Sequence, residues 1–492
     1  MSQPCARRRS FGIATGSVLL LAGCAVGPNF HRPSVPAGAG YAPVPLPTST
    51  ASAPLPGGAA QRFVDGLDIP GQWWTLFHSP ALNTLVSRSL AANPTLQAAQ
   101  ASLREARYQL YAGEGALFPS VSAAGSVTRE RVSGAELGEP SLSALFTLNT
   151  ASLSVSYLFD LWGGTRRQIE SLAAQVDYQR FELEASYLTL TSNVVTAAIQ
   201  EASLRGQISA TQQIIDIESQ ELAGDRREFE QGAAADTAVL AQAAALAQAR
   251  AQLAPLQKQL SQTRHELTAY LGELPSQQLT ETFELSSLQL PATLPVSVPS
   301  RVIEQRPDIR EAEAQMHAAS AQIGVATANL LPQLSLTGSL GSESLGSLLA
   351  PNTLIYSFGP GLAQPLFEGG RLVNRRHSAV AAWQATAANY REAVIGAFQN
   401  VADALRALQL DAEELDAESA AERAAADSLA ASRRQFHYGA ISYLALLTAE
   451  QSYQQALLSV VQAQAARYSD TVALFQALGG GWWNRQDVAS TH

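Results

Sequence analysis

The sequence predicts a mainly α-helical, internally duplicated chain that also contains four β-strands. Residues 141–254 and 366–492 contain no proline, so very long helices can form there. Aromatic residues make up only 7% of the chain while alanine is abundant, a composition that suits close helix packing. Four short segments instead alternate apolar and small polar residues with period two, which is typical of half-buried strands.

Two halves of the chain repeat one pattern. Residues 93–125 match 306–338 at an offset of 213, 157–160 match 365–368 at 208, and 226–232 match 433–439 at 207. Three collinear matches at nearly constant offset indicate a tandem duplication.

Each half is expected to begin with one helix, over about 80–117 and about 300–331. Pro119 and Pro332 end these helices, because proline cannot continue a helix and biases the preceding residue towards extended backbone. Strand-like alternation follows over 121–128 and 152–159 in the first half, and over 334–340 and 353–362 in the second.

Each strand pair leads into a helical hairpin. The outgoing helix of the first half, about 165–230, would extend roughly 100 Å at 1.5 Å per residue. The returning helices, 236–272 and 442–478, are shorter, and the second has an apolar stripe at helical spacing that predicts a packing seam.

Four strands leave two unpaired edges, which lipid does not tolerate. Since four strands are too few to close a barrel, we expect closure in a symmetric oligomer with eight or twelve strands.

The N-terminus has the form of an export signal. Arg7, Arg8 and Arg9 precede an apolar run too short to span a bilayer, and residues 1–23 are predicted to be a signal peptide. An ordinary cleaved signal is the alternative. The run ends in Leu21-Ala22-Gly23-Cys24, which resembles the bacterial lipoprotein box and implies a covalent lipid on Cys24. Seven prolines between 33 and 56 indicate an extended linker.

Composition argues against several functions. The formal charge of -10 disfavours nucleic-acid binding. The single lysine, Lys258, lies in no glycine-rich phosphate loop, and there is no HExxH or GxSxG motif. We therefore expect no enzyme, catalytic residue or metal site, and no cofactor beyond the lipid on Cys24.

Several segments resemble TolC-like outer-membrane efflux factors, in particular the NodT-type lipoprotein branch, over essentially the whole mature chain. The residues that carry the resemblance are 24–33 (CAVGPNFHRP), Trp73-Trp74, 305–310 (QRPDIR), 331–338 (LPQLSLTG), 367–371 (FEGGR) and 477–482 (ALGGGW).

The resemblance implies a homotrimer in the outer membrane, lipid-anchored and extending into the periplasm. Each chain would supply four strands to a twelve-stranded β-barrel, and the helices would form an α-barrel across the periplasm. It further implies a passive exit duct for drugs or other toxic small molecules. The partners would be a periplasmic adaptor (membrane fusion) protein and an inner-membrane RND-type pump.

The same resemblance suggests roles for the hairpin ends. The adaptor-docking tips would be Gln231, Gly232, Ala233, Tyr438, Gly439 and Ala440, although a plain helix-breaking turn is an equal reading of these glycines. Candidates for a periplasmic gate are Asp225, Arg226, Asp427, Arg433 and Arg434, each of which could also be an ordinary solvated charge.

These inferences divide the chain into six parts. They are the signal peptide 1–23, the lipidated N-terminus and linker 24–65, the first repeat 66–272, an equatorial linker segment 273–300, the second repeat 301–481 and the C-terminal tail 482–492.

The sequence is also compatible with two other functions. A type I protein-secretion duct would use the same fold. A lipid-anchored periplasmic coiled-coil spacer without a pore would explain the long helices, but not the four alternating strands.

Replacing Cys24 by alanine is expected to abolish lipidation, because the thiol is the acceptor atom. Metabolic labelling with a palmitate analogue measures this directly. Acylation that persists in Cys24→Ala would show that the lipoprotein box is misread.

Overall fold

A computed structural model describes residues 25–34, 41, 47–133, 135, 143–277, 279–350 and 352–485. Cys24, the signal peptide and residues 486–492 lie outside the described residues. Contacts divide the chain into two compact units. Unit 1 comprises the described residues of 1–32, 104–178 and 312–390, and unit 2 comprises those of 33–103, 179–311 and 391–492.

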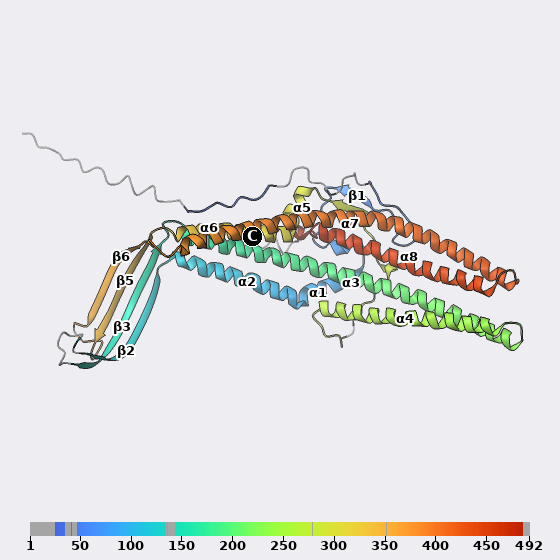
Figure 1. Ribbon diagram of the computed structural model, residues 1–492, viewed down its shortest axis with the longest axis horizontal. Coiled ribbons are helices and arrows are strands. Elements are labelled where there is room, and N and C mark those ends of the chain that lie inside the picture. The colour runs from blue at the N-terminus through green and yellow to red at the C-terminus, as the bar shows by residue number, and fades with distance from the viewer. Residues whose placement is uncertain are drawn as a thin grey trace, which may run out of the picture. The chain divides into compact units, whose positions relative to one another are not determined.

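Unit 1 contains a four-stranded antiparallel sheet in the order β2-β3-β5-β6 (Figure 1). The strands are β2 (Ser120–Val132), β3 (Ala144–Phe159), β5 (Gln333–Ser344) and β6 (Leu354–Ala363). All four lie where the alternation predicts them. Among the described residues, β2 and β6 each pair on one side only.

The register separates a polar face from an apolar face. Ser122, Ser154, Ser339 and Ser357 form one row across the sheet, and Ser339 Oγ lies 2.8 Å from Ser357 Oγ. The neighbouring rows belong to the opposite face and contain the large apolar side chains, which are exposed in the single chain: Val121, Leu153, Val155, Leu340, Tyr356 and Phe358. Period two therefore gives one face suited to lipid and one suited to water.

The first helix of each half is broken in two, unlike the single helices that the sequence predicted. The pieces are α1 (Pro80–Ala92) with α2 (Pro94–Glu114), and α5 (Pro299–Gln305) with α6 (Pro307–Ala328). Asn93 and Arg306 both have ψ 124°, because a following proline excludes the helical region. Ser79 caps α1 by accepting a hydrogen bond from the Leu82 amide.

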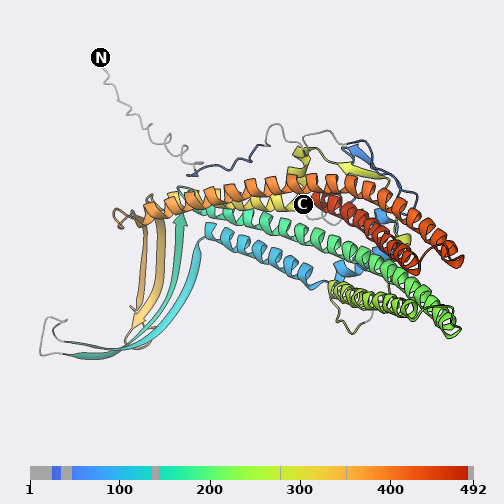
Figure 2. The same cartoon turned by 45° about the vertical axis from the view of Figure 1, so that its right-hand side comes forward.

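Two helical hairpins follow the strand pairs, and their lengths match between the halves. α3 (Gly164–Glu230) and α7 (Arg371–His437) each have 67 residues, and α4 (Asp236–Tyr270) and α8 (Tyr443–Ala477) each have 35. In both views α3 runs beside α4 and α7 beside α8 (Figures 1 and 2). No described helix has a stretch long and apolar enough to cross a membrane.

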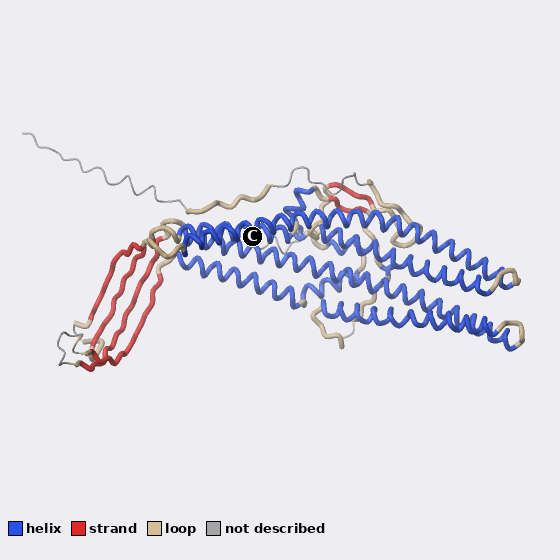
Figure 3. Tube along the Cα trace, in the orientation of Figure 1, coloured by secondary structure: helices blue, strands red, loops and turns tan. Residues whose placement is uncertain are grey.

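Unit 2 also contains a small parallel sheet of β1 (Arg62–Asp65) and β4 (Thr293–Val296), drawn in red in Figure 3 with the longer strands. Arg467 of α8 binds the segment that precedes β1 in the sequence. Its side chain is fully buried and donates to Thr50 Oγ1 at 3.1 Å, the Gly57 carbonyl at 3.1 Å and the Ala59 carbonyl at 2.6 Å.

A carboxyl pair lies beside this arginine. Burial, a hydrogen bond with Asp470 and the negative charges of Asp470 and Glu414 raise the pKa of Asp411 to about 8, although Arg467 opposes the shift. Two carboxyl groups that share one proton cannot both ionise without repulsion.

Stability is therefore expected to fall as the pH rises from about 4 to about 8. Over this range the folded Asp411 retains a proton that the unfolded side chain releases, because its pKa is raised in the fold. Thermal unfolding of Asp411→Asn and wild type should show the variant gaining relative stability between pH 5 and pH 9. Asp416→Asn, on the exposed surface of α7, is the control. If the difference in stability between Asp411→Asn and wild type stayed constant across this pH range, the prediction would be contradicted.

Candidate functional site: the ends of the helical hairpins

Each hairpin turns through a short loop with the same backbone hydrogen bonds. After α3, the Gly232 amide donates to the Phe229 carbonyl and the Ala233 amide to the Glu228 carbonyl. The second hairpin repeats this pair of bonds 207 residues later, from Gly439 and Ala440. This pattern ends a helix at a residue in the left-handed region.

Both glycines are required by the backbone and not by a lack of space. Gly232 has φ +72° and Gly439 has φ +67°, and a Cβ atom at either would meet nothing within 4 Å. Gln231, Gly232, Ala233, Gly439 and Ala440 are exposed, and Tyr438 is 82% exposed. The structure thus places all six predicted tip residues in the turns, and their role in docking stays a prediction.

The five candidate gate residues have different surroundings. Arg226, Asp427 and Arg434 lie on the helix surfaces and are exposed to solvent. Asp225 and Arg433 are half-buried and join one polar network inside unit 2, which connects the α3–α4 hairpin to the α7–α8 hairpin.

This network includes residues that the sequence reasoning missed. Gln242 of α4 is fully buried and donates to Glu218 Oε2 of α3 at 2.5 Å. The Tyr443 hydroxyl at the start of α8 donates to Gln242 Oε1 and also lies within hydrogen-bonding reach of Asp225. Gln454 donates to Glu218 Oε1 at 2.8 Å. Side chains of α3, α4 and α8 therefore meet at Glu218 and Gln242.

Arg433 supplies positive charge from α7. Its Nη2 lies 2.9 Å from Glu221 Oε1 and 3.4 Å from Glu450 Oε1. We refer to Glu218, Glu221 and Glu450 together as the carboxylate cluster. Burial and the neighbouring Glu221 charge raise the pKa of Glu218. Burial also raises the pKa of Glu450 to about 8, with a hydrogen bond to Glu221 as a further cause.

One sequence signal could have found part of this network. Glu218, Glu221 and Asp225 are spaced three and four residues apart, so they share one face of α3. Their partners on α4 and α8 become visible only when the hairpins are packed.

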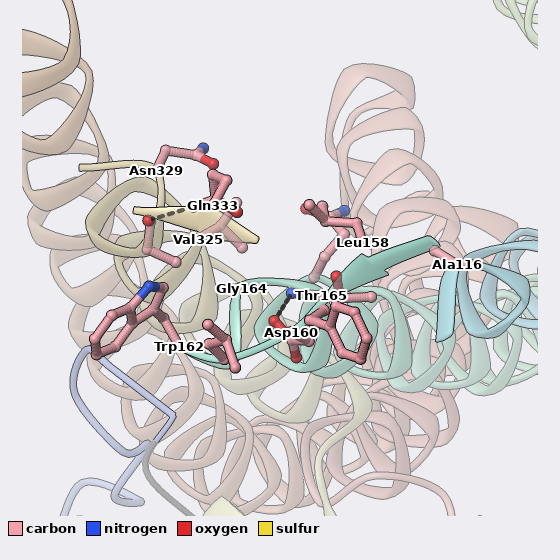
Figure 4. A pocket seen from close by; sticks show the side chains of 14 residues that line it. Ala116, Leu158, Asp160, Trp162, Gly164, Thr165, Val325, Asn329 and Gln333 are labelled. Carbon is pink, nitrogen blue, oxygen red and sulfur yellow. Dashed lines mark hydrogen bonds between the residues drawn. The ribbon is translucent and has the colours of Figure 1, made fainter. Parts of the chain in front are cut away.

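A second candidate is a pocket of 260 Å³ in unit 1, where strands and helices join (Figure 4). Asp160 lies in its lining and accepts hydrogen bonds from the Thr165 amide at 2.9 Å and the Arg166 amide at 3.0 Å, which caps α3. Gln333 donates to the Ala328 carbonyl at 3.0 Å. These polar groups make hydrogen bonds that stabilise the junction between the strands and the helices.

The family comparison agrees with this architecture. The model of the outer membrane efflux protein family matches residues 85–273 and 298–480, one block for each half of the duplication.

Known proteins are similar over almost the whole chain. The toluene efflux pump outer membrane protein TtgC of Pseudomonas putida is 29% identical, with 96% of each chain covered. The pyoverdine export outer membrane protein OpmQ of Pseudomonas aeruginosa is 31% identical, with 92% of this chain and 96% of OpmQ covered. The cation efflux system protein CusC of Escherichia coli is 28% identical, covering 94% and 97%.

Solved structures show the same fold. The outer-membrane channel OprN is 26% identical with a TM-score of 0.82, covering 93% of this chain and all of the other. The open state of the Neisseria gonorrhoeae MtrE outer membrane channel is 26% identical with a TM-score of 0.77, covering 93% and 99%.

The chain is thus an efflux channel subunit of the outer membrane that extends into the periplasm, and it is not an enzyme. It belongs to the outer membrane efflux protein family. The predicted fold class, a combination of α-barrel and β-barrel, is confirmed.

Replacing Gln242 by leucine is expected to weaken the packing between the hairpins. The change removes the acceptor of the Tyr443 hydroxyl of α8, which links the two hairpins, and also the donor to the buried Glu218 carboxylate of α3. A buried polar group left unpaired costs about 1–3 kcal/mol. The weaker packing should appear as faster hydrogen exchange along the ends of α3 and α8, together with a lower unfolding temperature. Gln248→Leu, at an exposed site of the same helix, is the matched control. Equal exchange in both variants would mean that Gln242 does not connect the hairpins.

Proposed function

We propose that three copies of this chain form the passive exit duct of a tripartite efflux system. An inner-membrane RND-type pump supplies the energy, and a periplasmic adaptor joins pump and duct. The duct conducts drugs or other toxic small molecules to the outside. The observation that carries the proposal is the four-stranded sheet with one apolar face and, in the described chain, two edge strands that pair on one side only.

A trimer meets the requirements of that sheet. Three copies supply twelve strands, and in a closed ring the β2 edge of one copy pairs with the β6 edge of the next. The apolar rows then face lipid, and the serine rows face a water-filled lumen.

The adaptor is proposed to dock at the two tips, which present exposed side chains at the hairpin ends. The duplication supports this assignment, because the two turns share their hydrogen bonds and a backbone geometry that needs glycine. Such matched ends offer similar surfaces to a repeating partner.

The names of the relatives support a broad class of cargo. TtgC is named for toluene efflux, OpmQ for pyoverdine export and CusC for cation efflux. Toxic small molecules are the class that we assign to this chain.

We also propose a covalent lipid on Cys24, which directly precedes a strap of described residues, 25–34. The strap is fixed to unit 1: the Val26 amide donates to the Trp162 carbonyl at 2.9 Å, and Phe30 stacks on His317 with ring centroids 4.4 Å apart. Arg167 donates to Asn29 Oδ1 at 2.7 Å. The proposed lipid would therefore be attached one residue before a segment that contacts the start of α3.

Deleting the gene is expected to raise the sensitivity of the cell to several toxic compounds, and a wild-type copy should restore resistance. Gly439→Val should restore it poorly, since a β-branched residue is strained at φ +67°. Growth inhibition is measured across a panel of toxic compounds.

Gly396→Ala, a helical glycine of α7 with open space around it, is the matched control. Unchanged sensitivity after deletion would contradict the efflux role. Full restoration by Gly439→Val, at equal abundance in the outer membrane, would contradict docking at this tip.

A further inference from the structure

The carboxylate cluster concentrates negative charge in a small volume of unit 2. One carboxylate oxygen from each of Glu218, Glu221 and Glu450 lies within 4.8 Å of the other two. Glu218 and Glu450 are each only 3% exposed, so water screens their repulsion poorly.

Positive charge at the cluster does not balance the carboxylates. Among the described residues, Arg433 is the one cation in an ion pair with the cluster. One guanidinium against three carboxylates leaves two negative charges uncompensated, and Asp225 adds a further carboxyl close to Glu221. Burial of unpaired charge is costly, so the site requires either protons or a cation.

Glu450 gives an independent indication of a missing ligand. Its Oε2 atom is buried and receives no hydrogen bond from an N–H or O–H donor in the described part of the chain. The hydrogen bond that Glu450 can form with Glu221 joins two carboxyl groups, so it requires a proton on one of them. Both oxygens of Glu218, by contrast, accept hydrogen bonds from glutamine side chains. An orphaned carboxylate oxygen beside two other carboxylates is suited to coordinate a metal ion.

We propose that the carboxylate cluster binds one hard divalent cation, with Ca²⁺ as the preferred ion. All the donor atoms are carboxylate or amide oxygens, which bind hard cations in preference to soft metal ions. Ca²⁺ accepts irregular arrangements of oxygen ligands at about 2.3–2.6 Å, whereas Mg²⁺ requires nearly ideal octahedral geometry at about 2.0–2.1 Å. Three carboxylate oxygens from two helices, all within 4.8 Å of one another, suit the ion that tolerates irregular geometry.

The neighbouring amides can complete the coordination. Gln242 and Gln454 donate to Glu218, and a half-turn of either amide would present its carbonyl oxygen instead. Arg433 can keep its contact with Glu221 at the edge of the cluster.

A bound ion would join the two hairpins of one chain. Glu218 and Glu221 come from α3, and Glu450 comes from α8. Coordination by both helices would resist their separation. If the chain acts as the proposed duct, the ion favours the state in which the hairpins are packed together.

Calorimetric titration of chelator-treated, purified full-length protein with CaCl₂ tests the site, followed by MgCl₂ in a separate titration. We expect one Ca²⁺ per chain, weaker binding of Mg²⁺ and a higher unfolding temperature with Ca²⁺. Glu450→Gln should weaken Ca²⁺ binding at least tenfold. Glu413→Gln, on the exposed surface of α7, should bind as the wild type does.

A folding defect is separated from a binding defect by the metal-free proteins. Glu450→Gln replaces a buried carboxyl group that lies beside two others with a neutral amide of the same shape, so without metal it should be at least as stable as the wild type. No saturable Ca²⁺ binding, or equal binding by wild type and Glu450→Gln, would overturn the proposal. Tighter binding of Mg²⁺ than of Ca²⁺ would overturn the assignment of the ion. The titration needs no transport, so a chain that binds Ca²⁺ but restores no resistance contradicts only the proposed function.

Discussion

The hydrogen-bonding groups along the outer sides of β2 and β6 are the constraint on which the rest of the architecture depends. In the described chain these strands pair on one side only, and the sheet between them has an apolar and a polar face. Backbone groups without partners are not tolerated in lipid, and four strands cannot close on themselves around a lumen. In the proposed trimer, pairing between copies would satisfy both edges at once. The rows of serine on one face and of large apolar residues on the other then acquire a consistent meaning, as lumen and lipid surfaces.

Duplication explains how one chain meets this constraint with matching helices. Each half supplies a strand pair followed by helices of 67 and 35 residues, and each hairpin turns at a glycine in the left-handed region. Equal helices allow the two hairpins to pack side by side. The same packing buries polar groups, including Gln242, Glu218 and Glu450, at the contact between hairpins. A contact built from carboxylates and amides depends on protons and ions, whereas an apolar seam would not.

Much of the fold could be predicted from the sequence, because local chemistry determines it. Period-two alternation located all four strands, and proline-free stretches located α3, α7 and α8, whereas α4 forms in spite of Pro255 in its interior. The helix breaks at Asn93 and Arg306 were missed, although the following prolines carry the signal, because each break takes a single residue out of the helical region and proline is tolerated in the first turn of the next helix. The candidate site was found only in part. The turn glycines have a local signature, whereas Gln242, Tyr443 and Glu450 acquire their partners only through packing of helices that are far apart in the sequence.

Edge pairing between copies can be observed by cysteine cross-linking. Pairs of cysteines would be introduced along the outer edges, one on β2 near Ser126 and one on β6 near Ser357, and oxidised in native outer membranes. Cys24 is kept, because its thiol is expected to carry the lipid, and the chain without introduced cysteines is the control. A closed twelve-stranded barrel predicts that pairs in register join the chains into a covalent ring of three, seen as a trimer band that reductant abolishes. Chains that remain monomeric at every register, or that link only into open-ended ladders, would contradict a closed barrel.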